Sequence, residues 1–256
     1  IRDSKHIMQN LNYGVIGNCS TAALISEKGA IEWLCFPEFD SPSVFAAILD
    51  RQKGGHFGFK VTSDYKVTQS YVPHTNILST HFESEEGAFD VVDFMPCYPT
   101  SDGKDFYRPA EIYRYIRWAK GRPRMKVDYR PAPNYARGKT VYNVTSQYVE
   151  TYSSVENKDR QYLYSSLDLK KVVNHDEITL EKDEFFLFSF NEKVIPVDIE
   201  REKLEYCRTL VYWLNWTDHA KRYTRYNEVI ERSMLVLKLM TYRLSLIHIS
   251  EPTRRS

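Results

Sequence analysis

The 256-residue sequence lacks an excess of charge of one sign. Its 35 lysines and arginines balance 34 aspartates and glutamates, which gives a formal net charge of +1. A balance of this kind provides no strongly basic face for nucleic acid. No apolar run approaches the roughly 18 residues that a membrane-spanning helix needs. We therefore expect a protein that binds neither nucleic acid nor membrane.

Glycine, proline and cysteine are also few. With 10 glycines and 11 prolines, the sequence is not collagenous, of low complexity or disordered. The cysteines are far apart, without a C-x-x-C pair or a histidine at metal-ligand spacing, and they are Cys19, Cys35, Cys97 and Cys207. We predict buried free thiols, no metal and no cofactor. Because charged residues interrupt the first six positions, no signal peptide is recognised and a cytoplasmic location is expected.

Aromatic residues are abundant, with 19 tyrosines, 13 phenylalanines and 4 tryptophans, and they favour strands. Short apolar or alternating segments follow one another up to about residue 191. They lie at 24–26 with 30–34, 76–83 with 88–94, 111–118, 124–129, 142–151, 161–165, 178–180 and 184–190. Segments 111–118 and 124–129 alternate as strands with one wet face do. Regular spacing without helical runs predicts an antiparallel β-sandwich. One short helix is expected at 43–50.

After Pro196 the period of the apolar residues changes to that of a helix. From 200 to 216, one predicted face carries Leu204, Cys207, Leu210, Val211 and Leu214. A second helix, 226–242, is apolar nearly all round, which is typical of a helix packed between other helices. The few residues that follow cannot supply such partners.

The last residues are interpreted as an artefact. The stretch from Leu244 to Arg254, LSLIHISEPTR, reads as the translation of an adapter used in sequencing libraries. Residues 244–256 are therefore excluded from fold reasoning, and the reading frame is interpreted as a truncated gene.

No catalytic pair of carboxylates is predicted. Glu85 and Glu86 lie in a turn, and Glu184 and Glu192 flank an apolar strand, so all four are expected as solvated charges. Asp90 and Asp93 are three apart on a strand and point to opposite faces. The seven histidines are scattered and define no triad.

Three stretches are the most specific in the sequence: YGVIGNCSTAALI at 13–25, GAIEWLCFPEFDSPSVFAAILD at 29–50 and RPAPNYARG at 130–138. They closely resemble the start of bacterial and archaeal proteins of glycoside hydrolase family 15, the glucoamylase and trehalase group. The likeness extends to 54–55, 92–96, 212–216 and 232–239. Asn18 and Glu32 stand where the family often has aspartate, which leaves any specific role of Asn18 open.

The resemblance implies an N-terminal supersandwich domain at 1–196, a helical linker at 197–225 and, at 226–243, the first helix of an (α/α)6 barrel. In the family that barrel carries two glutamates, a general acid and a general base, for inverting hydrolysis of α-glucosides. Neither glutamate maps onto this sequence, so we expect a non-catalytic portion whose partner is its own missing barrel. Packing between domains is expected at Trp213, Trp216, Leu235 and Leu239.

Two further interpretations are weaker. Phe39, Asp40 and Ser41 are candidates for shaping the substrate site near the mouth of the barrel, although Asp40 or Ser41 could instead cap the short helix after Pro42. The alternative function is a free-standing carbohydrate-binding sandwich, in which tyrosine and tryptophan rings stack on sugars. That alternative gives the two C-terminal helices no purpose.

Overall fold

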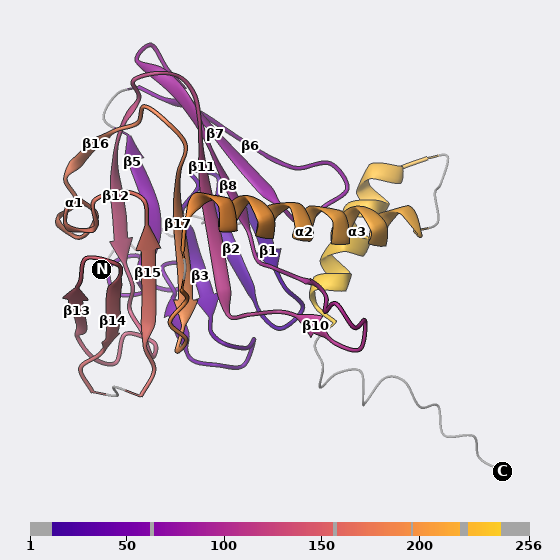
Figure 1. Cartoon of the computed structure of the whole chain (residues 1–256), viewed down its shortest axis with the longest axis horizontal. Coiled ribbons are helices and arrows are strands. Elements are labelled where there is room, and N and C mark those ends of the chain that lie inside the picture. The colour runs from indigo at the N-terminus through magenta and orange to yellow at the C-terminus, as the bar shows by residue number, and fades with distance from the viewer. Residues whose placement is uncertain (1–11, 62–63, 156–157, 196, 221–224, 242–256) are drawn as a thin grey trace, which may run out of the picture.

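Two antiparallel β-sheets face each other, and a long helix crosses the outer face of one of them (Figure 1). The computed structural model describes residues 12–61, 64–155, 158–195, 197–220 and 225–241. Residues 244–256, interpreted above as adapter-derived, lie outside this part. The prediction of a mainly β, antiparallel sandwich followed by two C-terminal helices is confirmed.

The first sheet has the order β1-β2-β3-β5-β12-β16, with β4 beside β3. Its strands are β1 (Tyr13–Gly17), β2 (Ala22–Ser26), β3 (Ile31–Cys35), β4 (Ser43–Phe45), β5 (His56–Val61), β12 (Arg124–Arg130) and β16 (Glu177–Thr179). The expected hairpin around Gly29 is β2–β3.

The second sheet has eight strands in the order β13-β14-β15-β17-β11-β8-β7-β6. They are β6 (Lys66–Tyr71), β7 (Leu78–Ser84), β8 (Gly87–Phe94), β11 (Glu111–Gly121), β13 (Thr140–Val144), β14 (Val149–Ser153), β15 (Gln161–Ser165) and β17 (Glu184–Phe190). The hairpin expected around 84–87 is β7–β8. Outside both sheets lie the small hairpin β9 (Tyr98–Pro99) and β10 (Phe106–Tyr107), and the helices α1 (Leu169–Asn174), α2 (Ile199–Asp218) and α3 (Asn227–Leu239).

The helix expected at 43–50 is wrong. Residues 43–45 form β4, which pairs with β3, and turns follow it. Val44 and Phe45 are both buried between the sheets, so tertiary packing outweighs the local pattern. Asp40 and Ser41 therefore have no helix to cap.

A phenylalanine cluster fills the space between the sheets. Alternate residues of β17, Phe186 and Phe188, point inward, where Phe186 meets Phe57 of β5 edge to face at 5.4 Å and Phe188 meets Phe45 at 5.5 Å between ring centroids. Burial of these rings supplies the main favourable term for folding.

One ion pair lies inside this apolar core. Arg114 of β11 and Asp93 of β8 are both fully buried, with Arg114 Nε 2.7 Å from Asp93 Oδ1. The guanidinium also donates to backbone oxygens of the opposite sheet, at Phe57 (2.6 Å) and Gly29, and stacks on the Phe57 ring at 4.7 Å. A single side chain thereby joins both sheets.

Replacing Arg114 by methionine should therefore destabilise the chain strongly. The substitution leaves the Asp93 carboxylate buried without its cation, a change that costs about 3 to 5 kcal/mol. Lys120→Met is the matched control, because Lys120 lies on the same strand but pairs with Glu83 where both side chains are exposed, and such pairs contribute about 1 kcal/mol or less. Urea unfolding of both variants measures the difference, and equal losses would contradict the proposed role of Arg114.

Candidate functional site

The outer face of the eight-stranded sheet is apolar and is covered by α2. Because side chains alternate along a strand, Phe94, Tyr113 and Leu187 point away from the sandwich interior, and all three are buried. Trp213 of α2 packs among them and is 1% exposed. We expected one face of β11 to be exposed to solvent, but at Tyr113 that face is covered by α2.

The face of α2 that packs on the sheet differs in part from the one predicted. Leu210 of the predicted face packs on the sandwich, but Leu204, Val211 and Leu214 are 49%, 55% and 39% exposed, and Cys207 is exposed as well, so it is not the buried thiol that we expected. The other three cysteines are buried free thiols, as predicted. The buried side chains of α2 are Glu202, Glu205, Thr209, Tyr212, Trp213 and Thr217, and the half-buried Ile199, Tyr206 and Trp216 pack beside them.

Polar partners outside α2 receive two of the buried polar side chains, Glu205 and Thr217. The Tyr98 hydroxyl donates to Glu205 Oε2 at 2.7 Å, and the Thr217 hydroxyl donates to the backbone oxygen of His74 at 3.3 Å. The helical period identified a genuine apolar stripe, but that stripe points away from the sheet. We call Leu204, Cys207, Val211 and Leu214 the α2 stripe.

A cavity of about 1040 Å³ lies between α2 and the β9–β10 hairpin. We call it the α2 groove. Its lining includes the middle of the α2 stripe, Cys207 and Val211, and the ring of Trp216. The other principal side chains are Tyr98, Tyr107, Tyr212, Arg201, Glu205 and Arg208. Aromatic walls with a few converging polar groups are typical of binding sites.

Two hydrogen-bonded chains fix the polar groups of the α2 groove. Arg208 Nη1 donates to Glu205 Oε1 at 3.3 Å, and the other oxygen of the same carboxylate accepts from the Tyr98 hydroxyl. Arg201 Nε donates to the Tyr113 hydroxyl at 3.3 Å, and that hydroxyl donates to Glu111 Oε2 at 2.9 Å. Burial raises the pKa of the Glu111 carboxyl above its usual range, and burial together with the nearby Glu111 raises the pKa of Tyr107 to about 12.

Helix α3 packs on the sandwich with one of its sides, whereas we expected it to lack packing partners on every side. Leu235 and Leu239 are 2% and 0% exposed and share the cluster that contains Trp213. The opposite side stays open, with Val229, Leu237 and Met240 66%, 67% and 53% exposed.

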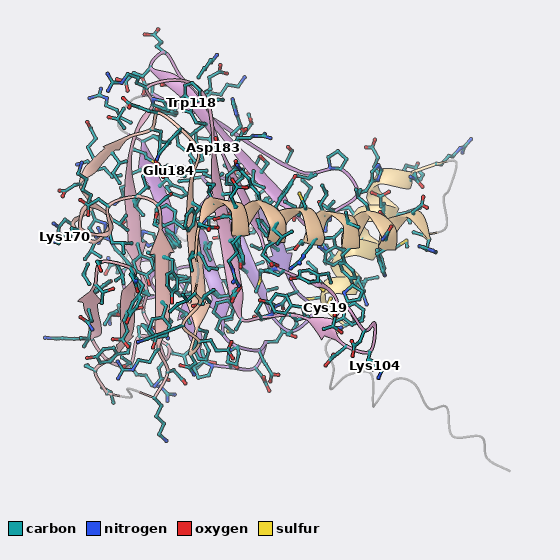
Figure 2. The ribbon with its side chains drawn as sticks, in the orientation of Figure 1. Cys19, Lys104, Trp118, Lys170, Asp183 and Glu184 are labelled. Atoms are coloured by element: carbon teal, nitrogen blue, oxygen red, sulfur yellow. The ribbon has the colours of Figure 1, made fainter. Side chains whose placement is uncertain are left out.

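The contacts of α3 with the sandwich are polar as well as apolar. Arg232 Nη1 donates to the Thr75 backbone oxygen at 2.9 Å, a second nitrogen donates to Asn76 Oδ1, and the guanidinium stacks on the Tyr71 ring at 3.9 Å. Asn76 in turn donates to the Leu235 backbone oxygen at 3.1 Å. The Cys19 thiol, labelled in Figure 2, donates to the Lys238 backbone oxygen at 3.4 Å. These contacts fix the direction in which α3 leaves the sandwich.

The loop with Phe39, Asp40 and Ser41 adjoins the turn between β1 and β2. Phe39 N donates to the Ser20 backbone oxygen at 3.1 Å, and Ser41 N closes a turn on Glu38. Asp40 is exposed, whereas Phe39 and Ser41 are half-buried. The loop is thus hydrogen-bonded to Ser20, the residue next to Cys19, whose thiol contacts α3. Local sequence patterns do not reveal this proximity.

Asn18 is a structural residue of the same turn. It is fully buried, its Oδ1 accepts from the backbone of Ser20 and Thr21, and its Nδ2 donates to the Pro109 backbone oxygen at 2.8 Å. An amide supplies both a donor and an acceptor here, whereas a carboxylate would supply acceptors only.

The carboxylates weighed in the sequence are dispersed. Asp90 and Asp93 point to opposite faces, as predicted. Glu86 pairs with Arg124. The expectation of a solvated charge is wrong for Glu184, which is 7% exposed. In Figure 2 it is labelled beside Asp183, whose Oδ1 accepts from the Trp118 backbone N–H at 2.9 Å.

Neither a metal centre nor a membrane span is found in the described part of the chain. No three histidine, cysteine, aspartate or glutamate side chains gather there as ligands. None of the helices described there has both the length and the hydropathy to cross a bilayer.

A family comparison adds to this geometry. Residues 8–157, more than half of the chain, match the family model described as trehalase-like, N-terminal. The chain belongs to this trehalase-like N-terminal family. The match covers β1 to β14 and so lies within the sandwich.

Relatives of this trehalase-like chain extend the similarity through the helices. A trehalase of Thermoplasma acidophilum is 29% identical over 239 residues, which cover 90% of this chain and 40% of the relative. A trehalase of Mycolicibacterium smegmatis is 25% identical, covering 94% of this chain and 39% of the relative. Trehalase 1 of Sulfolobus acidocaldarius is 51% identical over 85 residues, 32% of this chain and 14% of the relative. The chain therefore spans about two fifths of the length of the first two of these relatives.

Glu202 is the most unusual group of the helical layer. It is 1% exposed on the packed face of α2, and neither carboxyl oxygen has a hydrogen-bond partner among the described residues. Burial, with a smaller contribution from Asp93, raises the pKa of Glu202 well above its usual range. Burial therefore favours the protonated, neutral form of this side chain.

The free energy of unfolding should consequently depend on pH through Glu202. Because the folded pKa lies above the unfolded value of about 4.3, the folded state binds the extra proton, and stability falls as pH rises from that value toward the folded pKa. Glu202→Gln should flatten the decline in thermal midpoint between pH 5 and pH 8. Glu200→Gln, on the exposed side of the same helix, is the control; an unchanged slope in the Glu202 variant would show that the carboxyl is ionised in the folded chain.

Proposed function

We propose that this chain is the non-catalytic N-terminal portion of an inverting glycoside hydrolase of family 15 that acts on an α-glucoside. The trehalase relatives support a glucoside substrate such as trehalose for the whole protein. We assign the sandwich to residues 1–196, a helical linker to 197–225 and the first helix of an (α/α)6 barrel to 226–243. A cytoplasmic location and the adapter origin of residues 244–256 stay predictions from the sequence.

The observation that carries this proposal is the α2 stripe. Four apolar or sulfur side chains lie exposed on a helix whose opposite face is already packed, next to a groove lined by Trp216 and three tyrosines. Exposed apolar patches of this kind mark interaction surfaces. The relatives are about two and a half times as long as the aligned part of this chain, so the downstream domain is the partner that we propose for this surface.

The site residues take distinct places in this proposal. Trp216, at the edge of the α2 groove, would contact the downstream domain directly. Trp213, Leu235 and Leu239 are buried against the sandwich, so they would act by fixing the two helices. Phe39, Asp40 and Ser41, beside the turn that contacts α3, would lie near the downstream domain.

A carbohydrate-binding module is the second candidate function, and the α2 groove is the observation that favours it. Tyr98, Tyr107 and Trp216 offer aromatic faces, while Glu205 and Arg208 offer hydrogen-bonding groups. Such a module would retain affinity for maltooligosaccharides without a further domain and would lose it in Trp216→Ala. A docking surface would show no such affinity.

The purified chain is expected to release no glucose from trehalose or maltooligosaccharides. Inverting hydrolysis needs two carboxyl groups roughly 6.5 to 9.5 Å apart, and Glu205 is the one carboxylate among the described residues that line the α2 groove. A coupled glucose assay measures turnover, with a trehalase as positive control and Glu205→Gln as the matched variant. Glucose release that persists through purification and disappears in Glu205→Gln would overturn the non-catalytic assignment.

A further inference from the structure

A second cavity, of about 310 Å³, is lined by cationic side chains. It lies between the turn at 51–56, the end of β12 and the segment 131–140. Arg51, Lys53, His56 and Arg130 face it, and none of the described residues that line it carries a carboxylate. We propose that this cavity binds a phosphate group, either as the free anion or as the ester group of a small sugar phosphate.

A buried carboxylate, Asp128, organises two of these four side chains, Arg130 and His56. Asp128 of β12 has a side chain that is 5% exposed; it accepts from Arg130 Nε at 2.6 Å and contacts His56 Nε2 at 2.9 Å and Lys60 Nζ at 2.7 Å. Burial opposes ionisation of Asp128, but hydrogen bonds from Lys60, His56 and Arg130 outweigh it and lower its pKa overall. Arg130 is held through Nε, so its two terminal nitrogens remain as a fork that can donate to an oxyanion.

The backbone of the turn places the other two cations, Arg51 and Lys53, at the same cavity. Gly55 has φ +72°, and a Cβ there would lie 2.4 Å from the Arg130 backbone oxygen, so only glycine allows the turn to approach the end of β12 this closely. Asp50 Oδ1 accepts from the backbone of Gln52 at 2.9 Å and of Lys53 at 3.1 Å, which fixes the start of the turn. The turn thus places Arg51 and Lys53 around the same cavity as the terminal nitrogens of Arg130.

The charge of the cavity favours an anion with more than one negative charge. Asp128 contributes one negative charge against the positive charges of Lys60 and Arg130. Among the described residues, neither Arg51 nor Lys53 forms a salt bridge, although Lys53 interacts electrostatically with the exposed Asp50 carboxylate at the start of the turn. A phosphate group near neutral pH carries nearly two negative charges and three acceptor oxygens, which matches three cations around a small cavity. A neutral sugar would leave these cations without compensation.

Isothermal titration calorimetry on the 256-residue chain tests this assignment. The ligands are inorganic phosphate, glucose 6-phosphate and glucose, each at the same ionic strength, because screening alters any purely electrostatic association. The test variant is R51Q/K53Q, which spares Arg130 and its contact with Asp128. The control variant K104Q/K170Q removes the same charge at two exposed positions, which Figure 2 labels on separate parts of the surface.

The expected result is saturable binding of both phosphate compounds, weakened about tenfold or more in R51Q/K53Q and unchanged in K104Q/K170Q. Tighter binding of glucose 6-phosphate identifies the ester as the ligand, and equal or tighter binding of inorganic phosphate identifies the free anion. Circular dichroism confirms that each variant is folded. The proposal is overturned if the unmodified chain binds neither phosphate compound, if both double variants lose affinity equally, or if glucose binds as tightly as its phosphate.

Discussion

Arg114 reaches across the interior of the sandwich with its guanidinium wholly removed from water, and its contacts define how the two sheets meet. Its carboxylate partner Asp93 lies on the neighbouring strand, and its backbone acceptors at Gly29 and Phe57 belong to the opposite sheet. A buried guanidinium is stable only when a carboxylate and hydrogen-bond acceptors lie at particular positions around it. These contacts therefore determine how the two sheets are placed relative to each other around the phenylalanine core.

That placement determines the outer layer as well. When Arg114 and Asp93 point inward, their neighbours along the strands, Tyr113 and Phe94, point outward and need cover. Helix α2 provides it with Trp213, while its α2 stripe stays exposed. The β-sandwich thereby has one side covered by a helix with exposed apolar side chains, and this surface is the physical basis of the proposal that a further domain packs there.

The sequence was sufficient for most of the long strands and for the two C-terminal helices, because local alternation and a period of three to four residues report on them directly. It did not give β6 or the short helix α1, and its single segment 142–151 is two strands, β13 and β14. It also failed where long-range contacts decide. Residues 43–45 become a strand because β3 pairs with them, and α2 turns Glu205 inward where Tyr98, far away in the sequence, donates to it. The phosphate cavity likewise joins residues 51–56 to residues 130–140, which no local pattern connects.

The two sheets and α2 form a single packed body. Amide hydrogen exchange of the chain, resolved by residue, can test this packing, because groups in one cooperative unit open together. We expect amides in the middle of α2, near Thr209 to Trp213, to exchange about as slowly as those of β8 and β11. Exchange of α2 at the rate of an unfolded peptide, while β8 and β11 remain protected, would show that α2 is not part of this packed body.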